Sequence, residues 1–73
     1  MKTLSEFKTE IETEIEKRPS YIRYGQAVFN YIDEHYGVAR EAQFIHNVDC
    51  FHRDDLVDDF IRICYHILKD IED

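Results

Sequence analysis

A glycine lies inside the middle apolar segment of this chain, at position 25 in the run from Arg23 to Asn30. The apolar residues around it have helical spacing, and a glycine in a helix interior costs about 1 kcal/mol relative to alanine. A glycine at such a place usually has a packing reason, because the missing Cβ lets another segment lie directly against the backbone. We therefore expect a second helix to approach the backbone closely at Gly25.

Three segments have the apolar spacing of amphipathic helices. They cover residues from about 3 to 17, from 19 or 20 to about 36, and from about 53 to 71. Pro19 ends the first segment, and either Pro19 lies in the first turn of the second helix or Ser20 caps that helix. Gly37 ends the second segment as a left-handed residue. The last segment has the cleanest pattern, with a broad apolar stripe opposite a charged face.

The stretch between the second and the last segment is less regular. Residues 38–46 predict a short helix, and residues 47–52 predict a turn-rich connection whose Phe51 is inserted into the core. The sequence therefore predicts an all-α fold, a compact bundle of three main helices with a short extra helix between the second and the third. A chain of 73 residues without repeats or a long linker is expected to form a single domain over residues 1–73.

The charge of the chain excludes several classes of partner. Sixteen acidic residues and nine basic ones give a net charge of −7, which disfavours direct binding to nucleic acid or to an anionic membrane surface. A basic patch on another protein is the more compatible partner. The sequence contains no run of about 18 apolar residues and no apolar signal-peptide core, so we expect a cytoplasmic protein.

The small size of the chain also bears on its partners. For so short a chain, the entropy cost of ordering it nearly cancels the gain from apolar burial. Two cysteines do not make a disulfide framework. A homo-oligomer is therefore one expected way to supplement the core.

The candidate catalytic and metal-binding residues are few. His46, Cys50 and His52 lie within seven residues, but zinc needs four close ligands, and no second pair of ligands follows them. Cys50 with His52 lacks an evident third group to orient a nucleophilic pair, and two glycines do not make a phosphate-binding loop. We expect no enzyme activity, no metal and no cofactor.

Two surfaces are candidates for binding a partner protein. Glutamates stack along the first helix and are either a solvated face or a mimic of nucleic-acid phosphates that inhibits a basic, nucleic-acid-binding protein. Tyr24 and Tyr31, with Arg23 nearby, either form an exposed anchor patch or pack against the first helix. The leading hypothesis is a non-enzymatic acidic protein-interaction module that uses this patch.

One motif carries a resemblance to known proteins. Residues 19–55 resemble a group of small uncharacterised bacterial and phage-type proteins that share a helix of the form Arg-x-Gly-Gln-x-x-Phe-Asn, matched here by residues 23–30. Their turn of Asp, Phe and a polar pair is similar to Asp49, Phe51 and the two aspartates at 54–55, although Cys50 stands where a proline is expected. The resemblance implies a compact helical domain, often encoded among mobile-element genes, and it brings no known activity.

The polar residues of this motif have a structural interpretation. Gln26 and Asn30 lie one helical turn apart and are expected to hydrogen-bond the turn near Asp49. Arg23 is expected to pair with Asp49 or Asp54. Such a polar cluster would fix the connection onto the second helix, and it is the alternative to a binding site at the same place.

Overall fold

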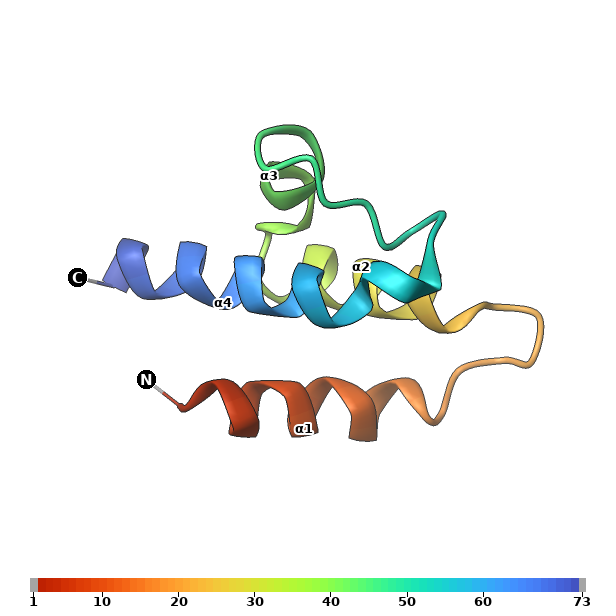
Figure 1. The fold of residues 1–73 in the computed structure, drawn as a ribbon. Coiled ribbons are helices and arrows are strands. Elements are labelled where there is room, and N and C mark those ends of the chain that lie inside the picture. Colours follow the sequence, from red (N-terminus) through yellow and green to blue (C-terminus); the bar gives the residue numbers. More distant parts are fainter. Residues whose placement is uncertain (1, 73) are drawn as a thin grey trace.

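The computed structural model describes residues 2–72 of the chain. Within them the chain forms an all-α bundle of three main helices and a short one, with no strand (Figure 1). The helices are α1 (Leu4–Ile15), α2 (Tyr24–His35), α3 (Ala39–Phe44) and α4 (Val57–Glu72), and a 3₁₀ turn, η1 (Asp54–Leu56), leads into α4. The predicted fold class, including the short helix before the last one, is confirmed.

The arrangement of the helices places α3 apart from α1. In Figure 1, α1 runs along one side of the molecule and α4 lies beside it in the opposite direction, while α3 sits on the far side of α4. α1 packs against α2 and α4, and α3 packs against the same two helices. The last turns of α4 extend past the start of α1 and past α3 (Figure 1).

The start of α1 is fixed by a capping box. The Thr3 hydroxyl accepts a hydrogen bond from the Glu6 backbone N–H at 3.2 Å, and the Glu6 carboxylate accepts one from the Thr3 N–H at 2.8 Å. These two bonds satisfy backbone donors that a helix start leaves free. They also hold the pKa of the Glu6 carboxyl below its usual value. The cap therefore sets where α1 begins.

The second helix begins later than the sequence predicts. Pro19 does not open α2. Its carbonyl accepts a hydrogen bond from the Ile22 N–H at 3.1 Å, and the helix starts only at Tyr24. Arg18 stabilises this turn by donating to the carbonyls of Ile15 and Ile22, both at 3.0 Å. Because one side chain satisfies carbonyls on both sides of the proline, the connection stays non-helical.

The end of α2 agrees with the sequence. Gly37 has a φ of +72°, the left-handed conformation expected after a helix, and its N–H donates to the Ile32 carbonyl at 3.0 Å. The chain then turns directly into α3.

A single apolar core joins all four helices. Within the described residues, no polar or charged residue is buried in this core. Phe51 packs at its edge and only partly fills the predicted place, whereas Cys50 beside it is fully buried. No helix within residues 2–72 has the length and apolar character needed to cross a membrane. The buried residues are Phe7, Ile11, Ile15, Ala27, Val28, Phe29, Ile32, Val38, Ala39, Ala42, Cys50, Val57, Phe60, Ile61, Cys64 and Ile67.

Candidate functional site

Gly25 lies against the connection between α3 and α4. A Cβ at this position would overlap the carbonyl oxygen of Cys50 and would lie 2.6 Å from a carboxylate oxygen of Asp54. The Gly25 N–H donates to that same carboxylate at 3.0 Å. The predicted close approach at Gly25 is therefore confirmed, but the approaching segment is this connection and not a second helix.

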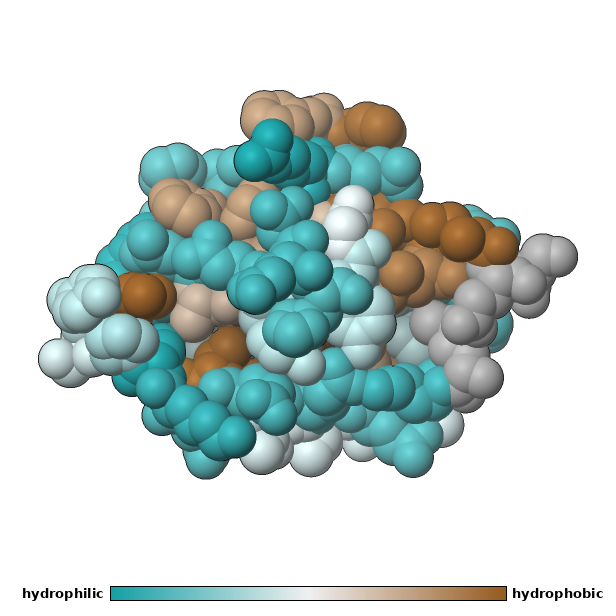
Figure 2. Space-filling view, turned by 180° about the vertical axis from the view of Figure 1, so that it is seen from behind, coloured by the Kyte–Doolittle hydropathy of each residue, from teal (hydrophilic) through white to brown (hydrophobic). Residues whose placement is uncertain are grey.

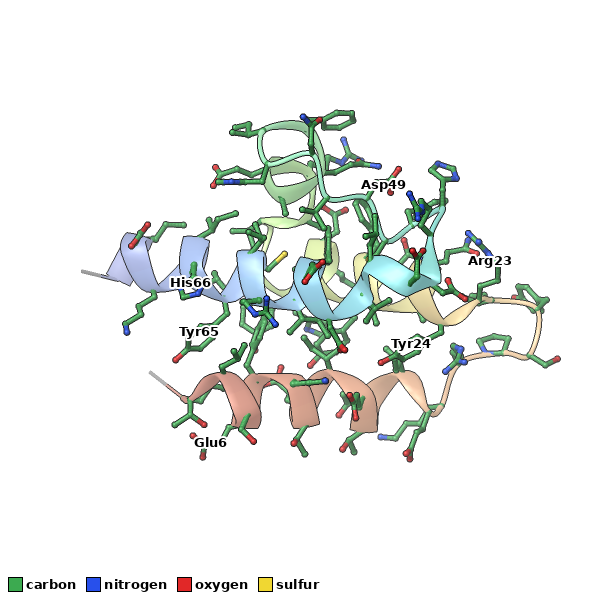
Figure 3. All side chains as sticks on the ribbon, in the orientation of Figure 1. Glu6, Arg23, Tyr24, Asp49, Tyr65 and His66 are labelled. Atoms are coloured by element: carbon green, nitrogen blue, oxygen red, sulfur yellow. The ribbon has the colours of Figure 1, made fainter. Side chains whose placement is uncertain are left out.

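Two more hydrogen bonds tie the same connection to the start of α2. The Arg23 guanidinium donates to the Phe51 carbonyl, and the Cys50 thiol donates to the Gly25 carbonyl at 3.4 Å. The predicted pairing of Arg23 with Asp49 or Asp54 is wrong, since the Asp49 carboxylate accepts from the Phe51 N–H at 3.0 Å and closes a local turn instead. Figure 3 shows Arg23 and Asp49 near this connection.

Gln26 and Asn30 do not take the predicted part in this cluster. Within residues 2–72, no hydrogen bond joins either side chain to the turn near Asp49. Asn30 is exposed and lines a groove between α1 and α2, and none of the residues lining this groove belongs to the connection. The bonds to the connection that were predicted for these amides are made instead by the Gly25 backbone, whose N–H binds Asp54 and whose carbonyl binds Cys50. The residues that hold the connection are therefore Arg23, Gly25, Cys50 and Asp54.

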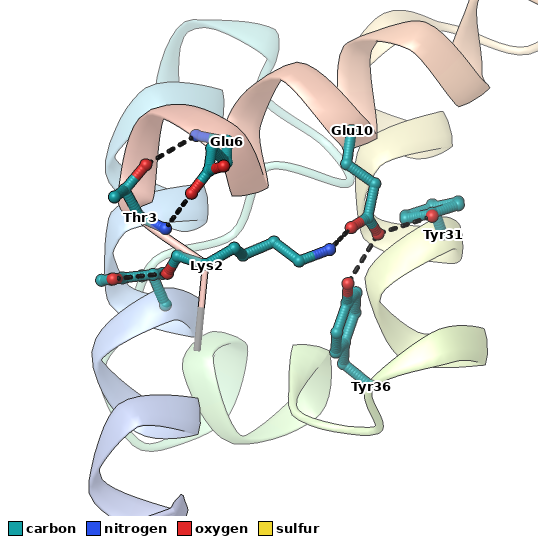
Figure 4. Close-up of polar contacts among 7 residues, drawn as sticks. Lys2, Thr3, Glu6, Glu10, Tyr31 and Tyr36 are labelled. Carbon is teal, nitrogen blue, oxygen red and sulfur yellow. Dashed lines mark hydrogen bonds and ion pairs between the residues drawn. The ribbon is translucent and has the colours of Figure 1, made fainter.

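The two tyrosines of the predicted anchor patch are engaged with neighbouring parts of the chain. Tyr31 donates its hydroxyl proton to the Glu10 carboxylate at 2.8 Å, and the Arg18 guanidinium lies 5.8 Å from the centre of the Tyr24 ring. Both tyrosines are only partly exposed, and burial raises the pKa of each. Their geometry matches the alternative in which they pack against the first helix, as Figure 3 shows for Tyr24 and Figure 4 for Tyr31.

Glu10 is the centre of this polar contact (Figure 4). Its carboxylate accepts hydrogen bonds from Tyr31 and, at 2.6 Å, from Tyr36, and it forms an ion pair with Lys2. Buried or half-buried networks of this kind hold two elements in register. Glu10 thus joins α1 to α2 and is not part of a free column of acidic side chains.

The aspartates at the start of α4 also have partners within the chain. Asp54 accepts from Gly25, Asp55 pairs with Arg53 at 2.7 Å, Asp58 with Lys8 at 2.8 Å and Asp59 with Arg62 at 3.4 Å. The three ion pairs are exposed and contribute little to stability. They nevertheless place a positive charge beside three of the four negative ones.

Cys50 and Cys64 are fully buried free thiols. Burial raises the pKa of each thiol to about 12, so neither is a thiolate near neutral pH. The described residues contain no group of three histidine, cysteine or acidic side chains placed to hold a metal ion. His46, Cys50 and His52, the candidate metal ligands of the sequence, are therefore not brought together as a site.

We expect both thiols to react with a thiol reagent only when the protein unfolds. Because the folded pKa of about 12 lies above the ordinary value of 9, the folded state holds these protons more tightly than the unfolded state. Their contribution to stability is present below pH 9 and is lost as pH rises toward 12. Urea unfolding followed at rising pH measures this loss.

The matched control for this prediction is a double variant, Cys50→Ala with Cys64→Ala. It should lose less stability over the same pH range than the parent protein, because it has no thiols to ionise. Rapid labelling of both thiols in the folded protein at neutral pH would contradict the prediction.

Four large apolar side chains are exposed in the described part of the chain. They are Tyr21 (82% exposed), Phe44 (72%), Ile45 (70%) and Ile71 (69%). Phe44 and Ile45 are adjacent at the end of α3. Figure 2 shows hydrophobic side chains protruding at this end of the molecule above a largely hydrophilic surface. Adjacent exposed apolar residues mark this end of the molecule as a candidate interaction surface.

Phe44 stands beside a groove on one flank of α3. The groove has a volume of about 280 Å³, and we call it the aromatic groove after its lining side chains Phe29, Arg40, Gln43, Phe44, Phe51 and His52. The Phe29 and Phe51 rings meet edge to face, with their centres 5.4 Å apart. Phe29 is buried in the core, so the Phe29–Phe51 contact connects the groove to the core, whereas Phe44 at the groove is 72% exposed.

The exposure of Phe44 and Ile45 is not predicted from the sequence, although the sequence contains a signal for it. The sequence of residues 38–46 predicts a short helix, and Phe44 and Ile45 are two of the apolar residues in this segment. A helix of six residues buries one narrow face, which here is made by Ala39 and Ala42. Phe44 and Ile45 follow these two alanines, and so short a helix cannot bury two further large apolar side chains.

Comparisons with family models, with curated proteins and with solved structures find no match to this chain.

Proposed function

We propose that the chain is a non-enzymatic protein-interaction module that binds a partner protein through the aromatic groove. The observation that carries the proposal is the exposed Phe44 ring beside a groove lined by two further phenylalanines. The resemblance of residues 19–55 to small uncharacterised bacterial and phage-type proteins supports an accessory role in a phage or mobile element.

The composition of the aromatic groove suits a protein partner. Aromatic residues and arginine are enriched where binding energy concentrates in interfaces. The Arg40 guanidinium is exposed and lies 3.9 Å from Asp33, a distance at which it remains available to an acceptor on a partner. A partner that places an apolar side chain against Phe44 and an acidic or carbonyl oxygen near Arg40 would fit this surface.

The other functions considered for the sequence have less support. An inhibitor that mimics nucleic acid needs carboxylates that are free to face a basic protein, but Glu6, Glu10 and the aspartates at the start of α4 are engaged within the chain. Nucleophilic chemistry at Cys50 is disfavoured because its thiol is buried and protonated.

Replacing the exposed phenylalanine tests the proposal directly. Tagged parent protein and a Phe44→Ser variant are used to capture partners from the source cell, with washes at low and high salt. We expect the parent to retain a partner at high salt, because the contact is mainly apolar. The variant should retain at least about tenfold less of that partner than the parent does. Quantitative mass spectrometry of the retained proteins measures the loss.

A matched control separates this surface from general stickiness. Tyr21→Ser removes an exposed aromatic ring in the connection between α1 and α2, which does not line the aromatic groove. This variant should leave capture unchanged. A partner held equally by the parent and by Phe44→Ser would contradict the proposal. Release of the partner by salt, together with its loss on Glu14→Gln, would favour the acidic mimic instead.

A further inference from the structure

A second groove lies on the other flank of α3, between this helix and α4. It has a volume of about 290 Å³, and we call it the acidic groove. Three residues of α4 form its apolar base, namely the half-buried Ile63, the buried Ile67 and Ile71, which is 69% exposed. Glu41 of α3 and Asp70 of α4 line the same groove, and both are exposed. The acidic groove therefore combines an apolar base with carboxylates from two different helices.

The charge of the acidic groove is opposite to that of the aromatic groove. Its remaining lining residues are His46 and His66. With histidine neutral at pH 7, the described lining carries two negative charges and no positive one. The aromatic groove has Arg40 and no carboxylate in its lining. The two flanks of α3 are therefore suited to partner groups of different charge.

Both carboxylates of the acidic groove are available to a group on a partner. Other acidic side chains are engaged within the chain, as Glu6 is in the capping box and Glu10 is with two tyrosines. Within residues 2–72, neither Glu41 nor Asp70 takes part in an ion pair or a side-chain hydrogen bond. A cation placed in this groove would neutralise carboxylates that no cation of the chain neutralises.

We infer that the acidic groove binds an arginine side chain of a partner protein. The aliphatic stem of an arginine packs on apolar surface while its charged end stays at the edge. In the acidic groove the stem lies on Ile67 and Ile71, and the guanidinium faces Glu41 and Asp70. A guanidinium carries five N–H donors in a planar fork, so it can bond to carboxylates on two helices. A lysine ammonium is a compact and more strongly hydrated charge, which suits an apolar base less well.

The net charge of the chain favours this occupant over a second copy. A net charge of −7 attracts a basic segment during diffusional encounter, whereas two copies of the chain repel each other. The partner segment would carry aliphatic residues beside its arginine to cover the exposed Ile71 side chain. In the view from behind, hydrophobic side chains gather toward the C-terminal end of α4, where Ile71 lies (Figure 2). Binding here does not depend on the aromatic groove and is separate from the proposed function.

Selection of short random peptides displayed on phage against the immobilised full chain tests the inference. Near neutral pH, we expect the enriched peptides to contain arginine beside aliphatic residues more often than the starting library does. Synthetic copies are then compared with copies in which citrulline replaces the arginine, because citrulline keeps the shape and removes the charge. Fluorescence anisotropy should show a Kd at least about tenfold higher for the citrulline copies. The Kd of the arginine copies should rise several-fold as sodium chloride rises from about 0.05 to about 0.5 M.

Neutral variants of the two carboxylates locate the binding on the chain. Glu41→Gln combined with Asp70→Asn should raise the Kd of the arginine peptides at least about tenfold, and Ile71→Ser should raise it as well. Glu16→Gln combined with Glu34→Gln is the matched control, since it removes the same charge at two exposed residues outside the acidic groove. The control should change the Kd by less than about twofold, because distant exposed charges are screened. Circular dichroism verifies that each variant keeps its helices.

Several results would overturn the inference. The selection could enrich no peptide, or only peptides without arginine. The citrulline copies, or the variant that lacks both groove carboxylates, could bind with an unchanged Kd. The parent could form a dimer that Ile71→Ser dissociates, since a second copy would then fill the groove. Peptides that Phe44→Ser releases and the carboxylate variant retains occupy the aromatic groove. If all enriched peptides behave in this way, the proposed function stands and this inference fails.

Discussion

Gly25→Ala is expected to destabilise the protein by about 3 kcal/mol. The added Cβ would overlap the Cys50 carbonyl oxygen and would lie 2.6 Å from the Asp54 carboxylate that the Gly25 N–H binds. The nearest atom belongs to the backbone, so relief requires the whole connection to move away from α2. Domains of this size have a total stability of roughly 4–11 kcal/mol, so the loss is a large fraction of it. Urea unfolding followed by circular dichroism measures the change.

Gly37→Ala is the matched control for this substitution. No atom lies within 4 Å of a Cβ built at Gly37, so its only cost is the left-handed φ of +72°, about 1 kcal/mol. Gly25→Ala should therefore be clearly the less stable of the two variants. Equal stability of the two would mean that the connection moves freely and does not pack on α2 as the structure shows.

The helices are predictable because their signals are local. Each main helix buries a stripe at helical spacing, and α4 shows the cleanest stripe in both the sequence and the structure. Gly37 ends α2 as predicted, since the left-handed conformation after a helix favours a residue without a side chain. The same reasoning gave the wrong start for α2. Arg18 donates to the carbonyls of Ile15 and Ile22, and the spacing of apolar residues does not reveal a side-chain contact of this kind even though both carbonyls are close in the sequence.

The contacts around Gly25 show where sequence reasoning fails. The sequence predicts a close neighbour at Gly25, but the partners it predicts for the polar residues around Gly25 are side chains. The actual acceptor for Arg23 is the backbone carbonyl of Phe51, and the actual partner of Asp54 is the backbone N–H of Gly25. Every residue carries such backbone groups, so the residue types give no hint of which ones will be used. Only the path of the connection determines the pairing.

The exposure of some apolar side chains cannot be predicted for a different reason. Helical spacing identifies the apolar residues of a segment, but it does not say whether a neighbour covers them. Ile11 and Ile71 both fit the stripes of their helices, yet Ile11 is completely buried and Ile71 is 69% exposed. The difference arises because α4 extends past its neighbours (Figure 1). The length of each helix relative to the others therefore decides which part of a stripe becomes a surface.

Phe7→Ala is expected to destabilise the protein by about 4 kcal/mol, the largest effect among single substitutions proposed for this chain. The Phe7 ring is 1% exposed and meets the rings of Tyr36 and Tyr65 at centre-to-centre distances of 5.2 and 5.8 Å. Truncation leaves a cavity between α1, α4 and the end of α2, and it removes both aromatic contacts. Denaturant unfolding and the loss of protection of α1 amides in hydrogen exchange measure the effect.

Phe44→Ala is the matched control, and its result also bears on the proposed interaction surface. The two substitutions remove the same atoms, but Phe44 is 72% exposed, so its loss should change stability by no more than about 0.5 kcal/mol. A stability cost near that of Phe7→Ala would show that Phe44 is part of the core and would remove the basis for the interaction surface. A negligible cost, combined with loss of a captured partner, would separate binding from folding at this residue.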